Sequence, residues 1–307
     1  MPLCAVSVDL DEIPNYHAIH GLPPPAGAGA HAVYDVGLDR LDALAAAHGV
    51  PLTLFAVGAD LARPESAARL RRMAERGHEM GNHTLDHAYD LTRLPPGEIR
   101  RQVGEGAAVI ERATGERPTG FRAPGYTVTD DVFDALRELG VTYGSSVFPC
   151  PPYYLAKVGA MARIRLGGRR SRSVLDTPQV LRAPTRPYRV GRPYWTRGEG
   201  VLELPVQVTR LARLPYIGTT ITLAGPTRAV WLTRLVLGEP LVNLELHGID
   251  VLDAEDGFPE LRAHQVDARI PHARKLEALG AVFALLARHG YTFVRLDEAA
   301  RHFARSS

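Results

Sequence analysis

Cysteine is scarce in this 307-residue chain, which contains only Cys4 and Cys150. The two residues lie far apart in the sequence. They have neither the Cys-x-x-Cys spacing of a redox motif nor the paired spacing of a cysteine-rich zinc site. We therefore expect neither a disulfide framework nor a cysteine-based metal site.

The chain also lacks a long hydrophobic run. No stretch reaches about 18 apolar residues, and the opening MPLCAVSVDL has neither the basic start nor the long apolar core of a secretion signal. We therefore expect a soluble, cytoplasmic protein. Hydrophobic residues make up 45% of the chain and charged residues 23%, which argues against a disordered or fibrous protein.

The chain also has no large excess of positive or negative charge, since its formal net charge is +2. Arginines nevertheless crowd the segment from Arg163 to Arg197, while the rest is near neutral or acidic. An anionic partner should therefore meet this segment. A nucleic acid partner is not expected.

Short β-branched runs alternate with longer segments that have apolar residues at helical spacing. The predicted strands are Leu3 to Val8, Leu52 to Val57, Gly120 to Arg122, Val141 to Ser145, Val201 to Val206, Leu241 to Leu246 and Tyr291 to Val294. The predicted helices are Val36 to His48, Glu65 to Arg76, Gly97 to Thr114, Asp130 to Leu139, Thr227 to Val236, His272 to Arg288 and Asp297 to Phe303. This alternation predicts one α/β domain over residues 1–307, a distorted (β/α) barrel of seven or eight units.

Two stretches interrupt the alternation. Residues 13–33 are rich in Pro, Gly and His and follow the first strand, so we expect a lid loop at its C-terminal end, where barrel active sites lie. Residues 148–200 are rich in Pro and Arg with little periodicity. We interpret them as an insertion, because strands resume afterwards.

The most informative segment contains His83 and His87. Residues four apart on a helical turn project from one face, so two imidazoles at this spacing can share one metal ion. Alone, such a pair among twelve histidines can arise by chance, and it does not complete a site.

Acidic residues end the first predicted strand. Asp9 and Asp11 are two apart and would point to the same side of an extended chain, toward the barrel mouth, and Glu12 follows them. The alternative is that these acids only end the strand and cap the next turn.

Together these segments resemble the NodB-homology polysaccharide deacetylases, carbohydrate esterase family 4. The first motif of that family is an apolar strand ending in two aspartates, and the second is His-Ser/Thr-x-x-His. The other segments that carry the resemblance are Thr53 to Gly58, Phe121-Arg122-Ala123-Pro124-Gly125-Tyr126 and Val242 to Gly248, which contains His247.

The resemblance implies a metal-dependent amide hydrolase with Asp11, His83 and His87 as ligands of one divalent ion. Zinc is the default ion for such a set, with cobalt, nickel or iron as alternatives. Asp9 would act as general base, held ionised by Arg122. By the same analogy, His247 would protonate the leaving amine, and a backbone N–H near Tyr126 would help to bind the oxyanion.

Three features depart from the family pattern. Asp9-Leu10-Asp11-Glu12 replaces the usual Asp-Asp-Gly, which leaves Glu12 as a substitute ligand. The tryptophan-bearing fourth motif has no clear match, and Gly144 stands where many relatives have Asp.

Substrate contacts are predicted from Pro124, Tyr126, Glu203 and Asp250. Glu203 would bond a sugar hydroxyl or a neighbouring arginine. Asp250 would orient the imidazole of His247 or cap a loop.

The predicted function is removal of an N-acyl group, with acetyl as the first choice, from an amino sugar that can be carrier- or nucleotide-linked. The alternatives are a deformylase of a lipid-phosphate-linked amino sugar, a cyclic imidase, and a non-catalytic glycan- or lipid-binding module. Peripheral contact with the inner membrane and a homo-oligomer remain open. The arginines from Arg163 to Arg172 would either bind a substrate phosphate or form a solvated surface.

Overall fold

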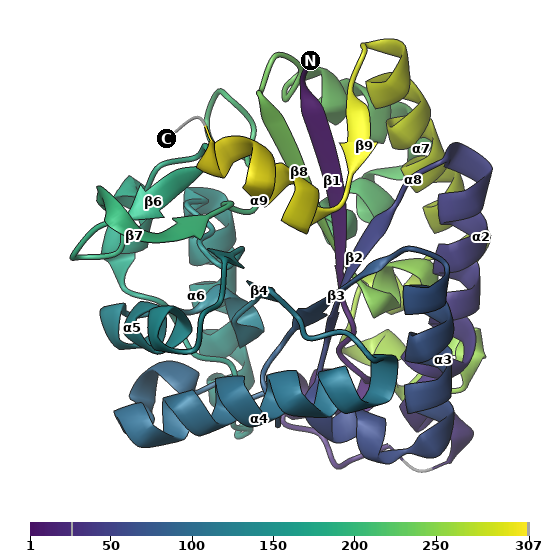
Figure 1. The fold of residues 1–307 in the computed structure, drawn as a ribbon. Helices are drawn as coiled ribbons and strands as arrows, with labels where there is room; N and C mark the ends of the chain where they lie inside the picture. The colour runs from purple at the N-terminus through teal and green to yellow at the C-terminus, as the bar shows by residue number, and fades with distance from the viewer. Residues whose placement is uncertain (26, 306–307) are drawn as a thin grey trace.

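The computed structural model describes residues 1–25 and 27–305, and its centre is a curled sheet (Figure 1). The strands are β1 (Leu3–Asp9), β2 (Leu52–Ala56), β3 (Glu79–Asn82), β4 (Gly120–Phe121), β5 (Tyr143–Gly144), β6 (Tyr188–Val190), β7 (Arg197–Glu203), β8 (Leu241–His247) and β9 (Thr292–Val294). They are ordered β6-β7-β5-β4-β3-β2-β1-β8, and β9 pairs with β1. The pairings are parallel except that β6 runs antiparallel to β7.

The sheet curls until the segment after β7 meets β8. The backbone N–H of Gln207 donates to the carbonyl of Asn243 at 3.1 Å, and Ile217 forms an isolated parallel bridge with Glu245. The side-chain amide of Asn243 also donates to the carbonyls of Leu204 and Pro205, at 2.9 and 3.1 Å. The predicted distorted (β/α) barrel is confirmed.

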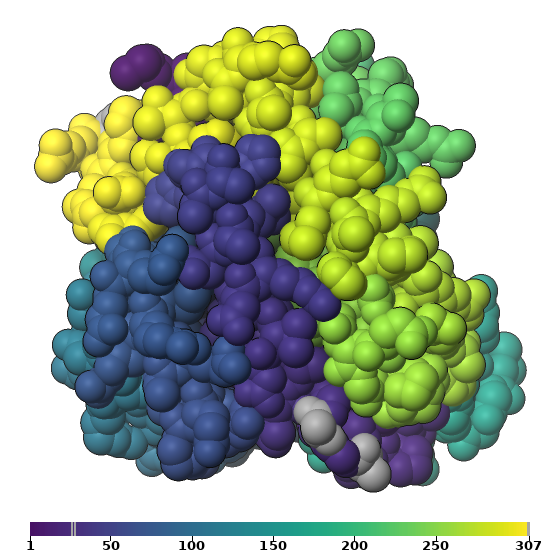
Figure 2. All heavy atoms as spheres, turned by 90° about the vertical axis from the view of Figure 1, so that its right-hand side faces the viewer, coloured from purple at the N-terminus to yellow at the C-terminus, as the bar shows by residue number. Residues whose placement is uncertain are grey.

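Nine helices of the described residues pack around the sheet. They are α1 (Ile13–His20), α2 (Leu38–His48), α3 (Pro64–Glu75), α4 (Pro96–Thr114), α5 (Asp130–Glu138), α6 (Pro151–Leu166), α7 (Gly218–Arg234), α8 (His272–Arg288) and α9 (Leu296–Ala304). Helix α2 packs between α3 and α8 on one face, so early and late parts of the chain meet there (Figure 2). Within the described residues, no helix is long and apolar enough to cross a membrane.

The end of the barrel at which the strands begin is closed by α9 (Figure 1). Leu296, Ala299 and Ala300 of this helix pack in one buried cluster with Phe55 of β2 and Tyr143 of β5. The opposite end, where the parallel strands finish, is therefore the one that can receive a substrate.

Strand β3 was not predicted, because its sequence Glu79-Met-Gly-Asn82 has no β-branched residue. The polar side chain at its start is buried in the barrel interior. Glu79 accepts hydrogen bonds from the hydroxyls of Thr53 and Tyr143, at 2.7 and 2.8 Å. These bonds compensate for the loss of hydration that otherwise excludes a carboxylate from a strand interior.

The predicted loop over residues 13–33 is partly wrong. Its first part is α1, which begins with Pro14 in its first turn and ends at Gly21, where the backbone is left-handed with φ of 64°. The predicted location is correct, since the segment directly follows β1. Residue 26 lies outside the described residues.

The predicted insertion over residues 148–200 is also partly wrong. It contains α6, and it provides β6 and most of β7 to the sheet. Apolar periodicity is weak because α6 buries a single residue, Ile164, so its other positions were free to be polar or small. Arg163, Arg165, Arg170 and Arg172 are exposed. Both the solvated surface and the phosphate site remain predictions.

Candidate active site

The predicted site residues meet at the end of the barrel where the parallel strands finish. In the register between β1 and β8, Asp9 is the partner of His247, and Ser7 is the partner of Glu245. His83 and Arg122 directly follow β3 and β4. Because neighbouring parallel strands finish at the same edge, side chains distant in sequence come together there.

His83 and His87 lie on an irregular loop, so the predicted helical turn is wrong. Thr84 and His87 have positive φ angles of 71° and 51°. The side chain of Asn82 holds the loop by accepting a hydrogen bond from the backbone N–H of Thr84 at 3.0 Å. The turn still brings the two imidazole rings together, with centroids 4.8 Å apart.

Helix α4 packs directly against this loop. The backbone N–H of Leu85 donates to the carbonyl of Gln102 in α4 at 2.9 Å. A Cβ atom at Gly106 would lie 2.9 Å from the backbone nitrogen of Leu85 and 2.8 Å from Oδ1 of Asn82. Glycine at position 106 therefore allows the close approach of α4 that supports the histidine loop.

Asp11 lies between the two histidines. Its Oδ1 atom is 3.2 Å from Nε2 of His83 and 3.0 Å from Nε2 of His87. One ligand atom from each of the three residues lies within 4.8 Å of the others, and all three residues are buried. The Nδ1 atom of His83 is 2.8 Å from the carbonyl of Arg122, and a proton on Nδ1 leaves Nε2 as the metal-binding atom.

These three residues fit a divalent metal ion. Oδ1 of Asp11 and both ring nitrogens of His87 are buried and have no hydrogen-bond partner of acceptable geometry. Such atoms are costly to bury unless a ligand pairs with them. Burial lowers the pKa of the His87 imidazole and favours its neutral, metal-binding form. Burial alone would raise the pKa of Asp11, but His87 and His83 outweigh it and hold that pKa well below the usual range.

Glu12, the predicted substitute ligand, has another role. Its two carboxylate oxygens accept hydrogen bonds from the backbone N–H groups of Val33 and Tyr34, at 3.1 and 3.2 Å. Burial raises the pKa of Glu12 to about 8. Glu12 therefore secures the segment that precedes α2, and it is not part of the Asp11 cluster.

Asp9 forms an ion pair with Arg122. The Nη1 atom of Arg122 donates to Oδ1 of Asp9 at 3.0 Å, while its Nη2 atom donates to the hydroxyls of Ser7 and Ser145. Burial raises the pKa of Asp9 and outweighs the opposing effect of Arg122. The pKa of a base raised in this way lies closer to neutral pH, which suits proton transfer.

Asp9, Glu245 and His247 form a second cluster whose ligand atoms also lie within 4.8 Å of one another. The buried Arg122 guanidinium stands beside Asp9, so this cluster already contains a cation. The Asp11 cluster contains no such guanidinium and is the better metal site.

His247 is paired with Glu245, a residue that was not predicted. Nδ1 of His247 lies 2.9 Å from Oε1 of Glu245, and 21% of the His247 side chain is exposed, whereas Glu245 is fully buried. Burial lowers the pKa of His247, but the charge of Glu245 outweighs it, so the pKa is well above its usual value. The sequence could have indicated this pair, because side chains alternate along a strand and residues 245 and 247 of β8 therefore lie on the same side.

Asp250 was predicted to orient this imidazole, and that prediction is wrong. Its carboxylate instead accepts hydrogen bonds from the backbone N–H of His247 at 2.9 Å and from the hydroxyl of Thr219 at 3.3 Å. It caps the turn after β8, the alternative given for it. The residue is fully buried, so the structure gives no support to a substrate contact.

We predict that Glu245→Gln moves the alkaline limb of the pH profile to lower pH. The substitution removes the negative charge that keeps His247 protonated, so the imidazole loses its proton at lower pH. Rates of amide hydrolysis measured across the pH range give this limb. Asp250→Asn should move the limb less, because Asp250 contacts the backbone of His247 and not its ring. A larger shift in Asp250→Asn would contradict this assignment.

The other residues that were predicted to contact the substrate lie in different surroundings in the structure. Glu203 is fully buried, and its Oε1 atom accepts hydrogen bonds from the backbone N–H groups of Ser146 and Val147, at 2.6 and 2.7 Å. Glu203 is therefore closed to solvent and bonds to backbone, and within the described residues it forms no ion pair with an arginine, although burial raises its pKa and the charge of Arg122 partly offsets that rise. Neither predicted bond, to a sugar hydroxyl or to an arginine, is seen. Pro124 is buried at the start of a short turn.

Tyr126 lines a cavity of about 370 Å³ together with His247. Its own backbone N–H donates to the carbonyl of Ala123 at 3.1 Å. The oxyanion contact predicted for a backbone N–H near Tyr126 stays a prediction. Among the predicted substrate residues, only Tyr126 lies on the cavity that reaches His247.

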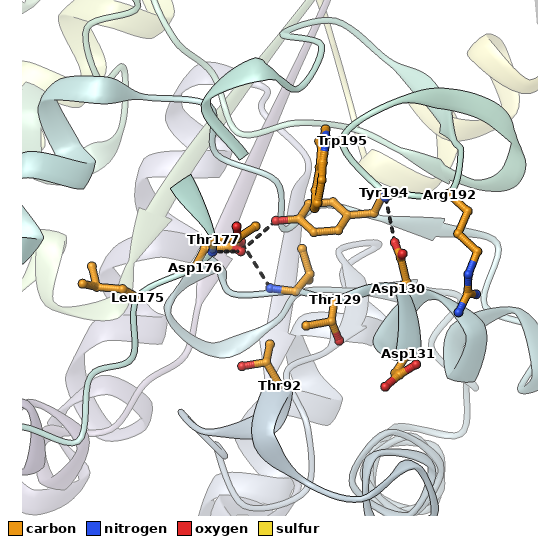
Figure 3. Close-up of a pocket in the computed structure, with 11 residues that line it drawn as sticks. Thr92, Thr129, Asp130, Asp131, Leu175, Asp176, Thr177, Arg192, Tyr194 and Trp195 are labelled. Atoms are coloured by element: carbon orange, nitrogen blue, oxygen red, sulfur yellow. Dashed lines mark hydrogen bonds between the residues drawn. The ribbon is translucent and has the colours of Figure 1, made fainter. Parts of the chain in front are cut away.

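A second cleft lies away from these residues, between the start of α5 and the segment before β7 (Figure 3). Its polar groups bond to one another: the hydroxyl of Tyr194 donates to Asp176, and the backbone N–H of Tyr194 donates to Asp130, both at 2.7 Å. None of the predicted catalytic or metal-binding residues lines it. This cleft is therefore separate from the candidate active site.

Residues 33–144 match the protein family described as Polysaccharide deacetylase, and this range contains His83, His87 and Arg122. The predicted resemblance is thereby confirmed. The chain is 37% identical over 105 residues to a chitooligosaccharide deacetylase of Bradyrhizobium sp. (strain ANU 289), a match covering 34% of this chain and 46% of that protein. It is 36% identical over 129 residues to a chitooligosaccharide deacetylase of Sinorhizobium fredii (strain NBRC 101917 / NGR234), covering 38% and 58%. The matches thus span about half the length of these relatives.

Solved structures show the same fold. A Mycobacterium smegmatis protein assigned to the polysaccharide deacetylases superimposes with a TM-score of 0.61 at 18% identity, covering 99% of this chain and 91% of that one. A mutant of a Bacillus anthracis pseudoenzyme of the same esterase family, with restored activity, superimposes with a TM-score of 0.53 at 14% identity. That match covers 98% of this chain and 68% of the other. A pseudoenzyme shares this fold, so activity has to be argued from the site residues.

Proposed function

We propose that this chain, whose residues 33–144 match the polysaccharide deacetylase family, hydrolyses the N-acetyl group of an amino sugar in a metal-dependent reaction. The observation that carries the proposal is the three-residue cluster of Asp11, His83 and His87, buried beside the Asp9–Arg122 ion pair and the His247 imidazole. Because residues are in place for the metal ligands, the general base and the general acid, we favour an enzyme over a non-catalytic binding module.

The metal ligands in this proposal are Asp11, His83 and His87. A divalent ion held by them supplies a Lewis acid that polarises the amide carbonyl and promotes the ionisation of water. Zinc is the proposed ion, because one carboxylate and two imidazoles form a typical zinc ligand set. The cytoplasm is the proposed location.

Asp9 acts as the general base and accepts the proton of the attacking water on its carboxylate. Its Oδ1 atom is held by Arg122 at 3.0 Å, which leaves the second oxygen, Oδ2, to face the site 3.9 Å from Nε2 of His83. The guanidinium fixes the orientation of the carboxylate during the reaction.

His247 acts as the general acid and donates the proton of its Nε2 atom to the leaving amine nitrogen. Its Nδ1 atom faces Glu245, so Nε2 is the nitrogen directed away from that partner. The raised pKa keeps the imidazole protonated at neutral pH, the state that an acid requires before bond cleavage.

We predict that the purified protein, supplied with zinc, releases acetate from N-acetylated amino sugars. The test is a panel of N-acetylglucosamine, its oligomers and N-formylated counterparts, with acetate or formate measured by a coupled assay. Faster release of formate than of acetate would favour the deformylase alternative. Neither acid being released from any member of the panel by the metal-loaded protein would end the proposal.

A further inference from the structure

The cavity beside His247 has mainly apolar walls. It lies between α1, α6 and α7, and its side chains include Ile19, Met161, Ile164, Ile217 and Leu223. Among the described residues that line it, Lys157 and His247 are the charged ones, and none is a carboxylate. Polar side chains also line it, among them Ser171, Ser173, Thr219, Thr220 and Gln265, and these can pair with the polar groups of a sugar. The apolar walls offer no such partners, so a bare oligosaccharide would leave them unmatched.

The position of His247 shows which part of a substrate the cavity can accept. His247 lines the cavity, whereas Asp9, Asp11, His83 and His87 do not. In the proposed reaction His247 contacts the leaving amine nitrogen. A group in the cavity is therefore attached on the amine side of the scissile bond and not on the acyl side.

Helix α6 turns one largely apolar face toward the cavity. Ala156, Ala160, Met161 and Ile164 recur at helical spacing and line the cavity. Leu223 of α7, on the cavity wall, is 41% exposed. Apolar side chains grouped around one open cavity indicate a ligand with hydrocarbon of its own.

We propose that the substrate is an amino-sugar amphiphile whose hydrocarbon chain, attached on the amine side of the amide, occupies the cavity between α1, α6 and α7. The inference rests on the proposed function, because it uses His247 as the acid that contacts the leaving nitrogen. It adds the class of substrate, a sugar with an alkyl or lipid aglycone instead of a free glycan.

The first test compares methyl, butyl and octyl β-glycosides of N-acetylglucosamine, each below the concentration at which it forms micelles. Each methylene buried in the cavity should raise kcat/KM about fourfold until the cavity is filled. A parallel series lengthens the N-acyl group on the methyl glycoside from formyl to hexanoyl. An increase along the acyl series with no increase along the glycoside series would place the chain on the acyl side and overturn the proposal.

A pair of variants on α6 tests the cavity itself. Ala160 and Ala162 are both exposed residues of α6, but only Ala160 lines the cavity. Ala160→Phe should abolish the gain from butyl and octyl chains, measured as the ratio of kcat/KM for the octyl glycoside to that for the methyl glycoside in the same variant. Ala162→Phe should behave as wild type. Equal chain-length dependence in both variants would contradict the assignment of the cavity.

Binding without hydrolysis separates this inference from the proposed function. Octyl and methyl β-glucosides carry no amide, and calorimetry should show octyl binding that Ala160→Phe weakens. If the two glucosides bind equally while N-acetylglucosaminides are hydrolysed, the cavity inference fails and the function stands. If octyl glucoside binds in the cavity but no amide is hydrolysed, the apolar binding site stands and the proposed function fails.

Discussion

Purified His87→Ala should contain almost no bound metal and should have lost its turnover. His87 provides one of three side chains around the site, and its Nε2 atom lies 3.0 Å from Oδ1 of Asp11. Two remaining ligands cannot hold a zinc-type ion as three do, since catalytic zinc sites use three protein ligands. His83→Ala should behave in the same way, and a chelator should abolish the activity of the wild-type protein.

Elemental analysis of the purified proteins gives a readout that does not depend on activity. The matched control is His48→Ala, which removes an exposed histidine at the end of α2, away from the site. It should retain the metal content of wild type. A metal-free preparation of the wild-type chain with full activity would rule out the proposed mechanism.

Asp9→Asn and His247→Ala should keep the metal and lose most of the turnover. General acid–base groups typically contribute about 10²–10⁴-fold each, so each variant should fall by about that factor in kcat. Asp9 should not be needed for metal retention, because its closest oxygen is 3.9 Å from Nε2 of His83, compared with 3.2 Å for Asp11. Kinetics at saturating substrate and metal content, measured on the same samples, test both statements.

Asp11→Asn distinguishes the roles of the two aspartates. It should lose metal where Asp9→Asn does not. The opposite pattern, with metal lost in Asp9→Asn and retained in Asp11→Asn, would show that the ligand and base have been exchanged. Unfolding in denaturant should accompany these assays, because Asp9 is the carboxylate partner of the buried Arg122.

Much of the barrel could be predicted because the spacing of apolar residues that indicates a helix or a strand lies within that element's own sequence. Helix α8 begins and ends at the predicted residues, and the strands near each predicted run form within a few residues of it. Apolar spacing encodes which face of a segment is buried, and burial of that face stabilises the element. The elements that were not predicted are β3, β6, α1 and α6. In two of them that rule is weak: β3 buries a hydrogen-bonded glutamate, and α6 buries almost nothing.

The limits of the sequence are clearest at the site. The motif spacing identified the candidate ligands, yet it assigned His83 and His87 to a helical turn that does not exist. The structure instead shows a loop supported by Asn82 and by the close approach of α4 at Gly106. Both arrangements bring two imidazoles together, so the inferred pairing was right while its geometrical reason was wrong.

The sequence by itself determined which residue types are available: two aspartates after an apolar strand, a histidine pair, and an apolar strand ending in His247. Only the tertiary structure decided which of them meet. The register between β1 and β8 places Asp9 beside His247, and burial decides that Glu245 pairs with the imidazole while Asp250 and Glu203 bond to backbone. The apolar cavity likewise exists only where α1, α6 and α7 converge. The physical reason is that periodicity reports on a residue's own element, whereas pairing, desolvation and cavity shape depend on contacts between segments far apart in the chain.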